Sequence, residues 1–166
     1  CHVAENIFTL FLPLSTGGIA HFGESIATVQ QDLREVSPTV FFGVPRIWVK
    51  MNASVTLRMK DSTWLKRTLF DYFSARGRII ADPDRKTPRS PLEKVIWFVG
   101  DILVFRPLQE RLGLRNCRLP VSGAAPIGAD LLRWFHGIGI PVQEGYGMTE
   151  CGGVSHISPI GDTRIG

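Results

Sequence analysis

The spacing of apolar residues along the chain predicts several amphipathic helices. Apolar residues recur every three or four positions after Ser25, a good helix N-cap, and again from Ile47 onward. Pro45 fits the first turn of this second helix, where its missing N–H costs nothing. A polar, proline-rich loop over residues 82–91 interrupts the pattern. We therefore predict helices over 5–14, 26–36, 45–80 (with breaks), 92–105 and 128–136.

Short β-rich runs lie between these helices and predict strands. Residues 39–44 form a continuous apolar run, typical of a strand that is buried on both faces. Shorter candidates lie at 19–22, 117–121 and 141–144. Because strands alternate with helices, and the first two strands enclose a helix, the pattern predicts βαβ units. The predicted fold class is α/β with a parallel sheet.

Length and composition exclude several classes of protein. The 166 residues suit one domain, and 44% hydrophobic with 20% charged residues argues against intrinsic disorder. Three cysteines are too few for a disulfide scaffold or a zinc knuckle, which favours a cytoplasmic setting. No apolar stretch reaches the length of a membrane span, and no signal-peptide pattern is present. The chain starts at Cys1 rather than Met, so we expect an internal piece of a longer protein.

Positive charge is concentrated in the middle of the chain. Residues 46–118 hold 16 Lys/Arg and 7 Asp/Glu, a net charge of +9, whereas the whole chain carries +4. Aromatic residues are interleaved with these cations. Three interpretations remain open: solvated faces of packed helices, contact with anionic lipid or a phosphorylated ligand, and nucleic-acid binding. The last is the weakest, because no nucleic-acid motif accompanies the charge.

Two loops of small residues, 122–126 and 145–150, each follow a predicted parallel strand. Open α/β sheets bind ligands at the carboxyl ends of such strands. In the second loop the ring of Tyr146 offers a stacking face, Thr149 a hydroxyl, and Glu150 a hard oxygen ligand suited to Mg²⁺. The alternative is purely structural: a glycine turn, a helix N-cap at Thr149 and a solvated carboxylate.

The second loop lies in a stretch of the chain that carries only negative charge. Between Trp134 and Thr163 the charged residues are Glu144, Glu150 and Asp162. A polyphosphate beside these carboxylates needs positive charge from a metal ion or from other segments.

Four motifs in order resemble those of the adenylate-forming (AMP-binding) enzymes. Residues 145–150, Gly-Tyr-Gly-Met-Thr-Glu, are similar to the YGxTE motif of that superfamily. Residues 122–126, Ser-Gly-Ala-Ala-Pro, resemble its adenine-side loop, and 42–48 resemble its "VPR" segment. Residues 1–5 resemble the end of an LPxxH motif. The long helical stretch between the second and third motifs favours the long-chain fatty-acyl-CoA synthetase branch.

The resemblance implies a partial N-terminal domain over residues 1–166, with a helical, basic segment at about 45–112. The family's Pro-Lys-Gly phosphate loop, Thr-Gly-Asp ribose motif and C-terminal lid with its catalytic lysine are not present in the sequence. It also implies roles for individual residues. Thr149 and Glu150 are the expected catalytic residues, with Glu150 as the Mg²⁺ ligand. The expected nucleotide-binding residues are Gly123, Ala124, Ala125, Gly145, Tyr146, Gly147, Met148 and Thr149, and those near the acyl substrate are His2, Gly43 and Pro45.

The implied activity is that of a long-chain fatty acid–CoA ligase. Such an enzyme converts a fatty acid and ATP to an acyl-adenylate and diphosphate, and CoA then displaces AMP. ATP/AMP, Mg²⁺ and coenzyme A are the implied cofactors and co-substrates, and the partners are fatty acid, ATP and CoA. We expect peripheral contact with an anionic membrane, no nucleic acid, and no turnover by the isolated chain. Three alternatives are an inert remnant that binds nucleotide or lipid, a membrane-surface binding module built on the basic segment, and an enzyme that activates aryl or amino acids.

Overall fold

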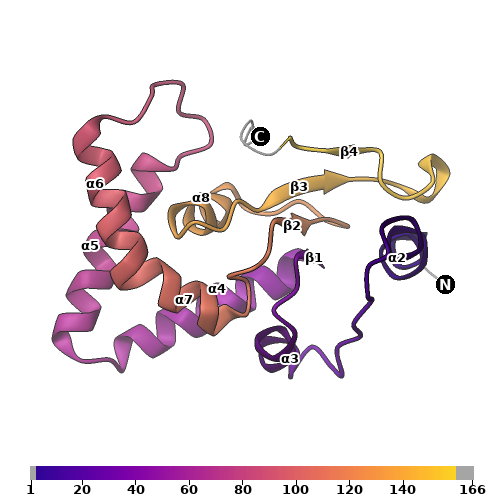
Figure 1. The fold of residues 1–166 in the computed structure, drawn as a ribbon, viewed down its shortest axis with the longest axis horizontal. Coiled ribbons are helices and arrows are strands. Elements are labelled where there is room, and N and C mark those ends of the chain that lie inside the picture. Colours follow the sequence, from indigo (N-terminus) through magenta and orange to yellow (C-terminus); the bar gives the residue numbers. More distant parts are fainter. Residues whose placement is uncertain (1–2, 160–166) are drawn as a thin grey trace.

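The computed structural model describes residues 3–159, which contain a four-stranded mixed sheet (Figure 1). Strands β1 (Val40–Gly43), β2 (Leu119–Ser122) and β3 (Gln143–Tyr146) are parallel neighbours, with Phe42 opposite Val121 and Ser122 opposite Glu144. Strand β4 (His156–Ile157) pairs antiparallel with β3. The predicted α/β class with parallel pairing is confirmed. The antiparallel edge strand was not predicted.

Helices connect the parallel strands. The connection from β1 to β2 contains α4 (Pro45–Lys60), α5 (Trp64–Ile80), α6 (Pro91–Gly100), the π-helical turn η2 (Asp101–Phe105) and α7 (Arg106–Leu112). Helix α8 (Ala129–Gly137) connects β2 to β3. The predicted helix over 45–80 is therefore two helices, broken at residues 61–63. Helix α6 begins at a capping box, in which the Ser90 hydroxyl accepts from the Glu93 N–H and the Glu93 carboxylate accepts from the Ser90 N–H.

In the N-terminal segment the predicted helix is present, but the strand predicted after it is not. The segment is helical over α1 (Val3–Asn6), the π-helical turn η1 (Ile7–Phe11) and α2 (Leu12–Thr16), and ends at Gly17 with a positive φ. The strand predicted at 19–22 is wrong, because these residues pair with no strand and Ile19 and Phe22 lie exposed. Flanking glycines end regular structure on both sides, and the run lacks a neighbouring strand to bury it. The βαβ unit built on it is wrong as well.

Helix α3 (Val29–Val36) begins later than Ser25. The Ser25 hydroxyl instead accepts hydrogen bonds from the N–H groups of Ala27 and Thr28, at 3.2 Å each, and so stabilises the turn that leads into the helix. The N-cap of α3 is Thr28, so the prediction of Ser25 as N-cap is wrong.

The two faces of β1 contact different parts of the fold. The Phe41 ring packs edge-on against Trp48, which also meets Phe135 of α8, and both Trp48 and Phe135 are fully buried. The next side chain, Phe42, points to the opposite face and stacks on Phe8, with ring centroids 4.5 Å apart. The helical core thus covers one face, and the N-terminal helix covers the other.

Helices α5 and α8 approach each other closely in this core. A Cβ atom added at Gly77 would lie 2.1 Å from the carbonyl oxygen of Gly137, so the two backbones touch at glycines. Among the described residues no helix is long and apolar enough to cross a membrane.

Candidate functional site

A cavity of about 200 Å³ opens where β2 and β3 end. In Figure 1 the carboxyl end of β3 points toward the N-terminal helix, and Val3 of that helix forms part of the wall. The complete lining is Val3, Phe42, Val121, Ala124, Gly145, Tyr146, Gly147, Met148, Thr149, Gly153 and Val154. The cavity thus lies at the edge of the sheet where parallel α/β folds bind ligands.

The wall formed by residues 145–154 depends on a close contact between two backbone segments. A Cβ atom at Gly147 would lie 1.6 Å from the Gly153 carbonyl oxygen, so only glycine fits there. Between these residues the 3₁₀ turn η3 (Thr149–Cys151) reverses the chain, and the Gly153 N–H donates to the Met148 carbonyl at 3.1 Å. The Ser155 N–H donates to the Tyr146 carbonyl at 2.9 Å, which starts the pairing with β4. The turn holds Tyr146 and Thr149 at the cavity.

The loop after β2 adopts an uncommon backbone conformation. Ala124 has a φ of 69°, in the left-handed region that side chains other than glycine rarely enter. Just before it, the Gly123 N–H donates to the Gly43 carbonyl at 3.4 Å, and a Cβ at Gly123 would lie 2.7 Å from the Phe42 ring. Strained backbone of this kind occurs most often at binding sites. This loop therefore presents backbone, rather than side chains, to the cavity.

Most residues predicted to bind nucleotide meet at this cavity. Its lining includes Ala124, Gly145, Tyr146, Gly147, Met148 and Thr149. Gly123 lies buried beneath the lining, and Ala125 is exposed outside it. The Tyr146 ring is largely exposed, so a planar group entering the cavity has an open face to stack on.

Gly43 and Pro45, both predicted near an acyl substrate, are not part of the cavity lining. Gly43 is buried at the end of β1, where its carbonyl accepts a hydrogen bond from the Trp48 indole N–H at 3.1 Å. Pro45 begins α4, and neither residue lines the cavity. His2 lies outside the described residues. Their assignment to an acyl tunnel stays a prediction.

Glu150 is exposed on η3, beside Thr149 and next to the cavity rather than in its lining. In the described part of the chain, no group of three or more His, Cys, Asp or Glu residues could hold a metal ion by itself. A single exposed carboxylate fits Mg²⁺, which commonly takes one or two protein carboxylates and completes its shell with water and phosphate oxygens. No Lys or Arg lines the cavity.

Several residues of the cavity were missed by the sequence analysis, namely Val3, Phe42, Val121, Gly153 and Val154. Phe42 and Val121 could have been found, because both occupy predicted strands that lead to the site. The Gly152–Gly153 pair was a second available signal, since adjacent glycines after a motif indicate a tight backbone approach. Val3 belongs to the segment that resembles the LPxxH motif, but nothing in the sequence indicated that this distant segment reaches the cavity wall.

Next to the cavity, Ser122 ends β2 with its hydroxyl oxygen buried and without a hydrogen-bond partner among the described residues. A buried hydroxyl without a partner costs free energy, about 1–3 kcal/mol in mutational data. Such a group is unusual in a folded core and lies here one residue before the Gly123–Ala125 loop.

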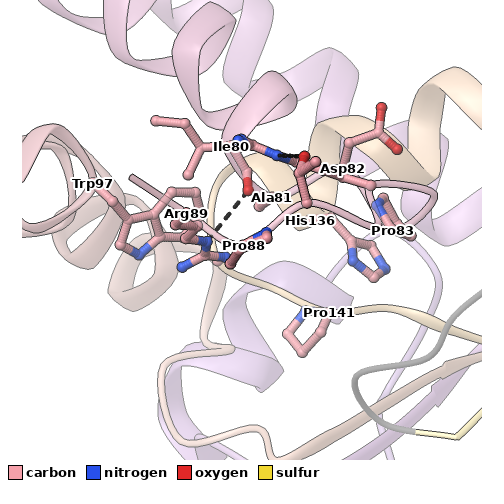
Figure 2. A pocket seen from close by; sticks show the side chains of 12 residues that line it. Ile80, Ala81, Asp82, Pro83, Pro88, Arg89, Trp97, His136 and Pro141 are labelled. Carbon is pink, nitrogen blue, oxygen red and sulfur yellow. Dashed lines mark hydrogen bonds between the residues drawn. The ribbon is translucent and has the colours of Figure 1, made fainter. Parts of the chain in front are cut away.

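A larger cavity of about 430 Å³ lies on the other side of the molecule, between the 82–89 loop, Trp97 and the end of α8 (Figure 2). Its polar groups are mostly satisfied within the protein. The Arg85 guanidinium donates two 2.9 Å hydrogen bonds to the Glu93 carboxylate, and His136 Nε2 donates to the Val142 carbonyl at 2.9 Å. Burial lowers the pKa of His136, which favours its neutral form. Arg89 stacks over the Trp97 ring at 4.7 Å, as Figure 2 shows.

The comparison of the two cavities favours the smaller one as the functional site. The larger cavity lies at the amino end of β3, where α/β sheets do not usually bind ligands, and its charged groups are largely engaged in internal pairs. The smaller cavity combines the strand ends, the strained Ala124 backbone and the Thr149 hydroxyl.

Comparisons with known proteins identify the family. The AMP-binding enzyme family matches residues 1–166. The long-chain-fatty-acid–CoA ligase ACSBG2 of Xenopus laevis is 34% identical over 160 residues, which cover 95% of this chain and 21% of that protein. The protein of the same name from Rattus norvegicus is 32% identical over 161 residues, covering 95% and 24%. A putative fatty-acid–CoA ligase, fadD11, of Mycobacterium tuberculosis is 31% identical over 170 residues, covering 99% and 29%.

The chain spans only about a quarter of the length of these curated relatives. No solved structure matches it. Since the family match covers every residue, and the matching motifs meet at one cavity, the chain belongs to the AMP-binding enzyme family.

Proposed function

We propose that this chain forms the adenine- and phosphate-binding part of an ATP-dependent long-chain fatty acid–CoA ligase. The observation that carries the proposal is the cavity at the ends of β2 and β3, which combines the 122–126 and 145–150 loops. Relatives that share 30–34% identity over at least 95% of this chain bear the ligase name. On this proposal residues 1–166 belong to the large N-terminal domain, and the basic segment 45–112 forms its helical part.

The proposed roles follow from the chemistry of each group. The flat backbone at Ala124, with Gly123 buried behind it and Ala125 next to it, would contact the adenine, and the Tyr146 ring would stack near it. The Thr149 hydroxyl would donate a hydrogen bond to an α-phosphate oxygen. Gly145, Gly147 and Met148 would shape the adjoining wall by keeping the backbone close to the nucleotide.

The phosphates need positive charge, because no cation lines the cavity. Glu150 would hold Mg²⁺, which when bound would neutralise phosphate charge and orient the leaving diphosphate. Further positive charge would come from segments of the longer protein. Removal of divalent metal is therefore expected to weaken ATP binding more than AMP binding, since ATP carries the larger charge.

The proposed reaction has two steps. An oxygen of the fatty carboxylate attacks the α-phosphorus of ATP, and the bond to diphosphate breaks, giving an acyl-adenylate. The thiolate of coenzyme A then attacks the acyl carbon, and AMP leaves as the thioester forms. The protein contributes mainly positioning and stabilisation of charge. Gly43 and Pro45 would lie toward the acyl group, as would His2.

The test is fatty-acid-dependent diphosphate release by the longest protein that this reading frame encodes. Thr149→Ala and Glu150→Ala should each lower the rate roughly 100-fold, the usual cost of losing one contact to developing charge. Thr68→Ala on α5 and Glu110→Ala on α7 remove the same groups from exposed helix positions and serve as matched controls. Rates for the two site variants equal to those of the controls would refute the assigned roles.

We also propose that the protein is cytoplasmic and contacts anionic membranes peripherally through its basic segment. The support is the net charge of +9 over residues 46–118. Clustered Lys and Arg residues are attracted to anionic lipid within a Debye length of the surface. Co-sedimentation with anionic vesicles at low salt tests this contact independently of the ligase assay.

A further inference from the structure

The continuous helix formed by α6 and η2 carries a row of apolar side chains that the fold leaves exposed. All six are between 38% and 69% exposed. They recur at spacings of three and four residues, which places them along one side of a helix. We call this side the outer face; it consists of Leu92, Val95, Phe98, Val99, Ile102 and Leu103.

The opposite side of the same helix is fixed in the core, so the helix cannot turn to bury its outer face. The Phe105 ring is buried and lies 5.2 Å from the Trp97 ring. Gly100 is buried against Phe73 of α5, where an added Cβ would lie 2.7 Å from the Phe73 ring. Six exposed large apolar side chains on one helix exceed the scattered exposure that is normal for a soluble surface.

This helix carries one lysine and two acidic residues. Its two acidic residues are both paired: Glu93 with Arg85 at 2.9 Å, and Asp101 with Arg106 at 2.7 Å. Lys94 has no carboxylate partner in the described part of the chain. The helix therefore presents apolar side chains and an uncompensated cation.

The neighbouring helices add to this positive charge. Residues 45–112 hold 14 Lys/Arg and 7 Asp/Glu, and two of these acids, Asp82 and Asp84, pair with Arg133 from outside the segment. Helix α5, which lies beside α6 at the end of the molecule farthest from α2 (Figure 1), carries Lys66, Arg67, Arg76 and Arg78 against a single acid, Asp71. An apolar helix face among unpaired cations is complementary to a surface that is apolar inside and anionic outside.

We propose that the outer face inserts into the boundary between headgroups and acyl chains of an anionic membrane, while the cations of α5 and α6 contact lipid phosphates. This inference rests on the proposed membrane contact and assigns it to particular side chains; it does not depend on the ligase chemistry. No described helix is both long and apolar enough to cross a bilayer. On this proposal the helix lies in the plane of the interface. The candidate nucleotide cavity lies at the carboxyl ends of the strands, away from α6 (Figure 1).

The test compares two triple variants. Each replaces one Leu, one Ile and one Phe by glutamine, so both lose the same apolar side chains and keep the same charge. The outer-face variant combines Leu92→Gln, Phe98→Gln and Ile102→Gln; glutamine keeps the helix propensity. The control replaces Leu14, Ile19 and Phe22 of the N-terminal segment, which are the same residue types and are more exposed, by glutamine. Binding is measured by co-sedimentation with vesicles of phosphatidylglycerol and phosphatidylcholine, with pure phosphatidylcholine vesicles as the uncharged comparison.

We expect the wild-type protein and the control to bind the anionic vesicles, and the outer-face variant to bind at least tenfold more weakly. Some wild-type binding should persist at 0.5 M salt, where screening removes the contribution of charge alone. Equal binding by the two triple variants would overturn the insertion, and so would complete loss of wild-type binding at high salt. Either result would indicate a purely electrostatic contact. Absence of wild-type binding at low salt would overturn both.

Two further measurements test whether something other than a membrane covers the outer face. If the wild-type protein is a dimer, and the outer-face variant is a monomer that binds vesicles as the wild type does, a second copy covers this face and the proposal fails. Should the triple variant not fold, Phe98→Cys in a Cys1→Ser and Cys151→Ser background, labelled with an environment-sensitive dye, gives the same information. A blue shift on adding anionic vesicles supports insertion, and an unchanged spectrum contradicts it.

Discussion

Gly147 offers the sharpest test of how the candidate site is built. In Gly147→Ala the new Cβ would lie 1.6 Å from the Gly153 carbonyl oxygen, whereas an ordinary contact needs at least 3.4 Å. Both groups belong to the backbone, so neither can rotate away, and the two segments must separate by about 1.8 Å, the difference between those two distances. That movement breaks the short bonds that close the turn, including the one from the Gly153 N–H to the Met148 carbonyl.

The loss of stability in Gly147→Ala can be calculated from these contacts. Overpacking of this kind destabilises by about 1–3 kcal/mol, and each lost backbone hydrogen bond adds about 1 kcal/mol. We therefore expect a loss of about 2–4 kcal/mol in the free energy of unfolding. For a chain of this size that corresponds to a fall of roughly 4–16 °C in Tm.

The matched control is Gly128→Ala, where an added Cβ meets nothing within 4 Å and φ is −65°. Its cost should stay below about 1 kcal/mol, the usual limit for a change at a helix N-cap. Urea unfolding measures both variants, and hydrogen exchange over residues 143–157 locates the damage. Equal stabilities, with unchanged exchange in that segment, would show that the close contact does not constrain the turn.

Two further predictions concern pH and thiol reactivity. Hydrogen bonds from Arg85 and from the Ser90 N–H lower the pKa of Glu93 from 4.5 to about 2, so its stabilising effect is complete above pH 4.5 and is lost as the pH falls toward 2. Acid unfolding curves should show this slope, and Glu93→Gln should remove it; a variant with the same slope as wild type would contradict the pairing. Burial raises the pKa of the Cys117 thiol to about 11, whereas Cys151 is exposed. At pH 8 an alkylating reagent should label Cys151 within minutes and Cys117 only after unfolding, and equal labelling rates would disprove the burial of Cys117.

The parallel sheet and the two loops of the site could be predicted because their signals are local. The apolar run at 39–44 predicts a strand, and the small residues at 122–126 and 145–150 predict loops, without reference to distant residues. Since ligands bind at the carboxyl ends of parallel strands, the two loops also predict the position of the site. Thr149 and Tyr146 were found in this way, and both line the cavity.

The failures concern contacts between distant residues. The run at 19–22 is as apolar as a strand, but a strand exists only where a neighbour offers free backbone groups, and the described structure provides none there. Phe42 was correctly placed in a strand. Its position in the cavity wall depends on contacts with Phe8 and Val3, which are far from it in the sequence. Periodicity cannot reveal which of two faces a distant helix will cover.

The connection between β1 and β2 has a consequence for how the chain folds. These strands are hydrogen-bonded neighbours, but residues 44–118 separate them in sequence, and most of that interval is helical. Closing so long a loop carries an entropic cost that local helix formation does not have to meet. The helices α4 to α7 should therefore form and pack early, and the pairing of β1 with β2 should complete the transition state. Until then β1 has an unpaired edge, so slow closure of this crossover is the step at which the nascent chain is most exposed to aggregation.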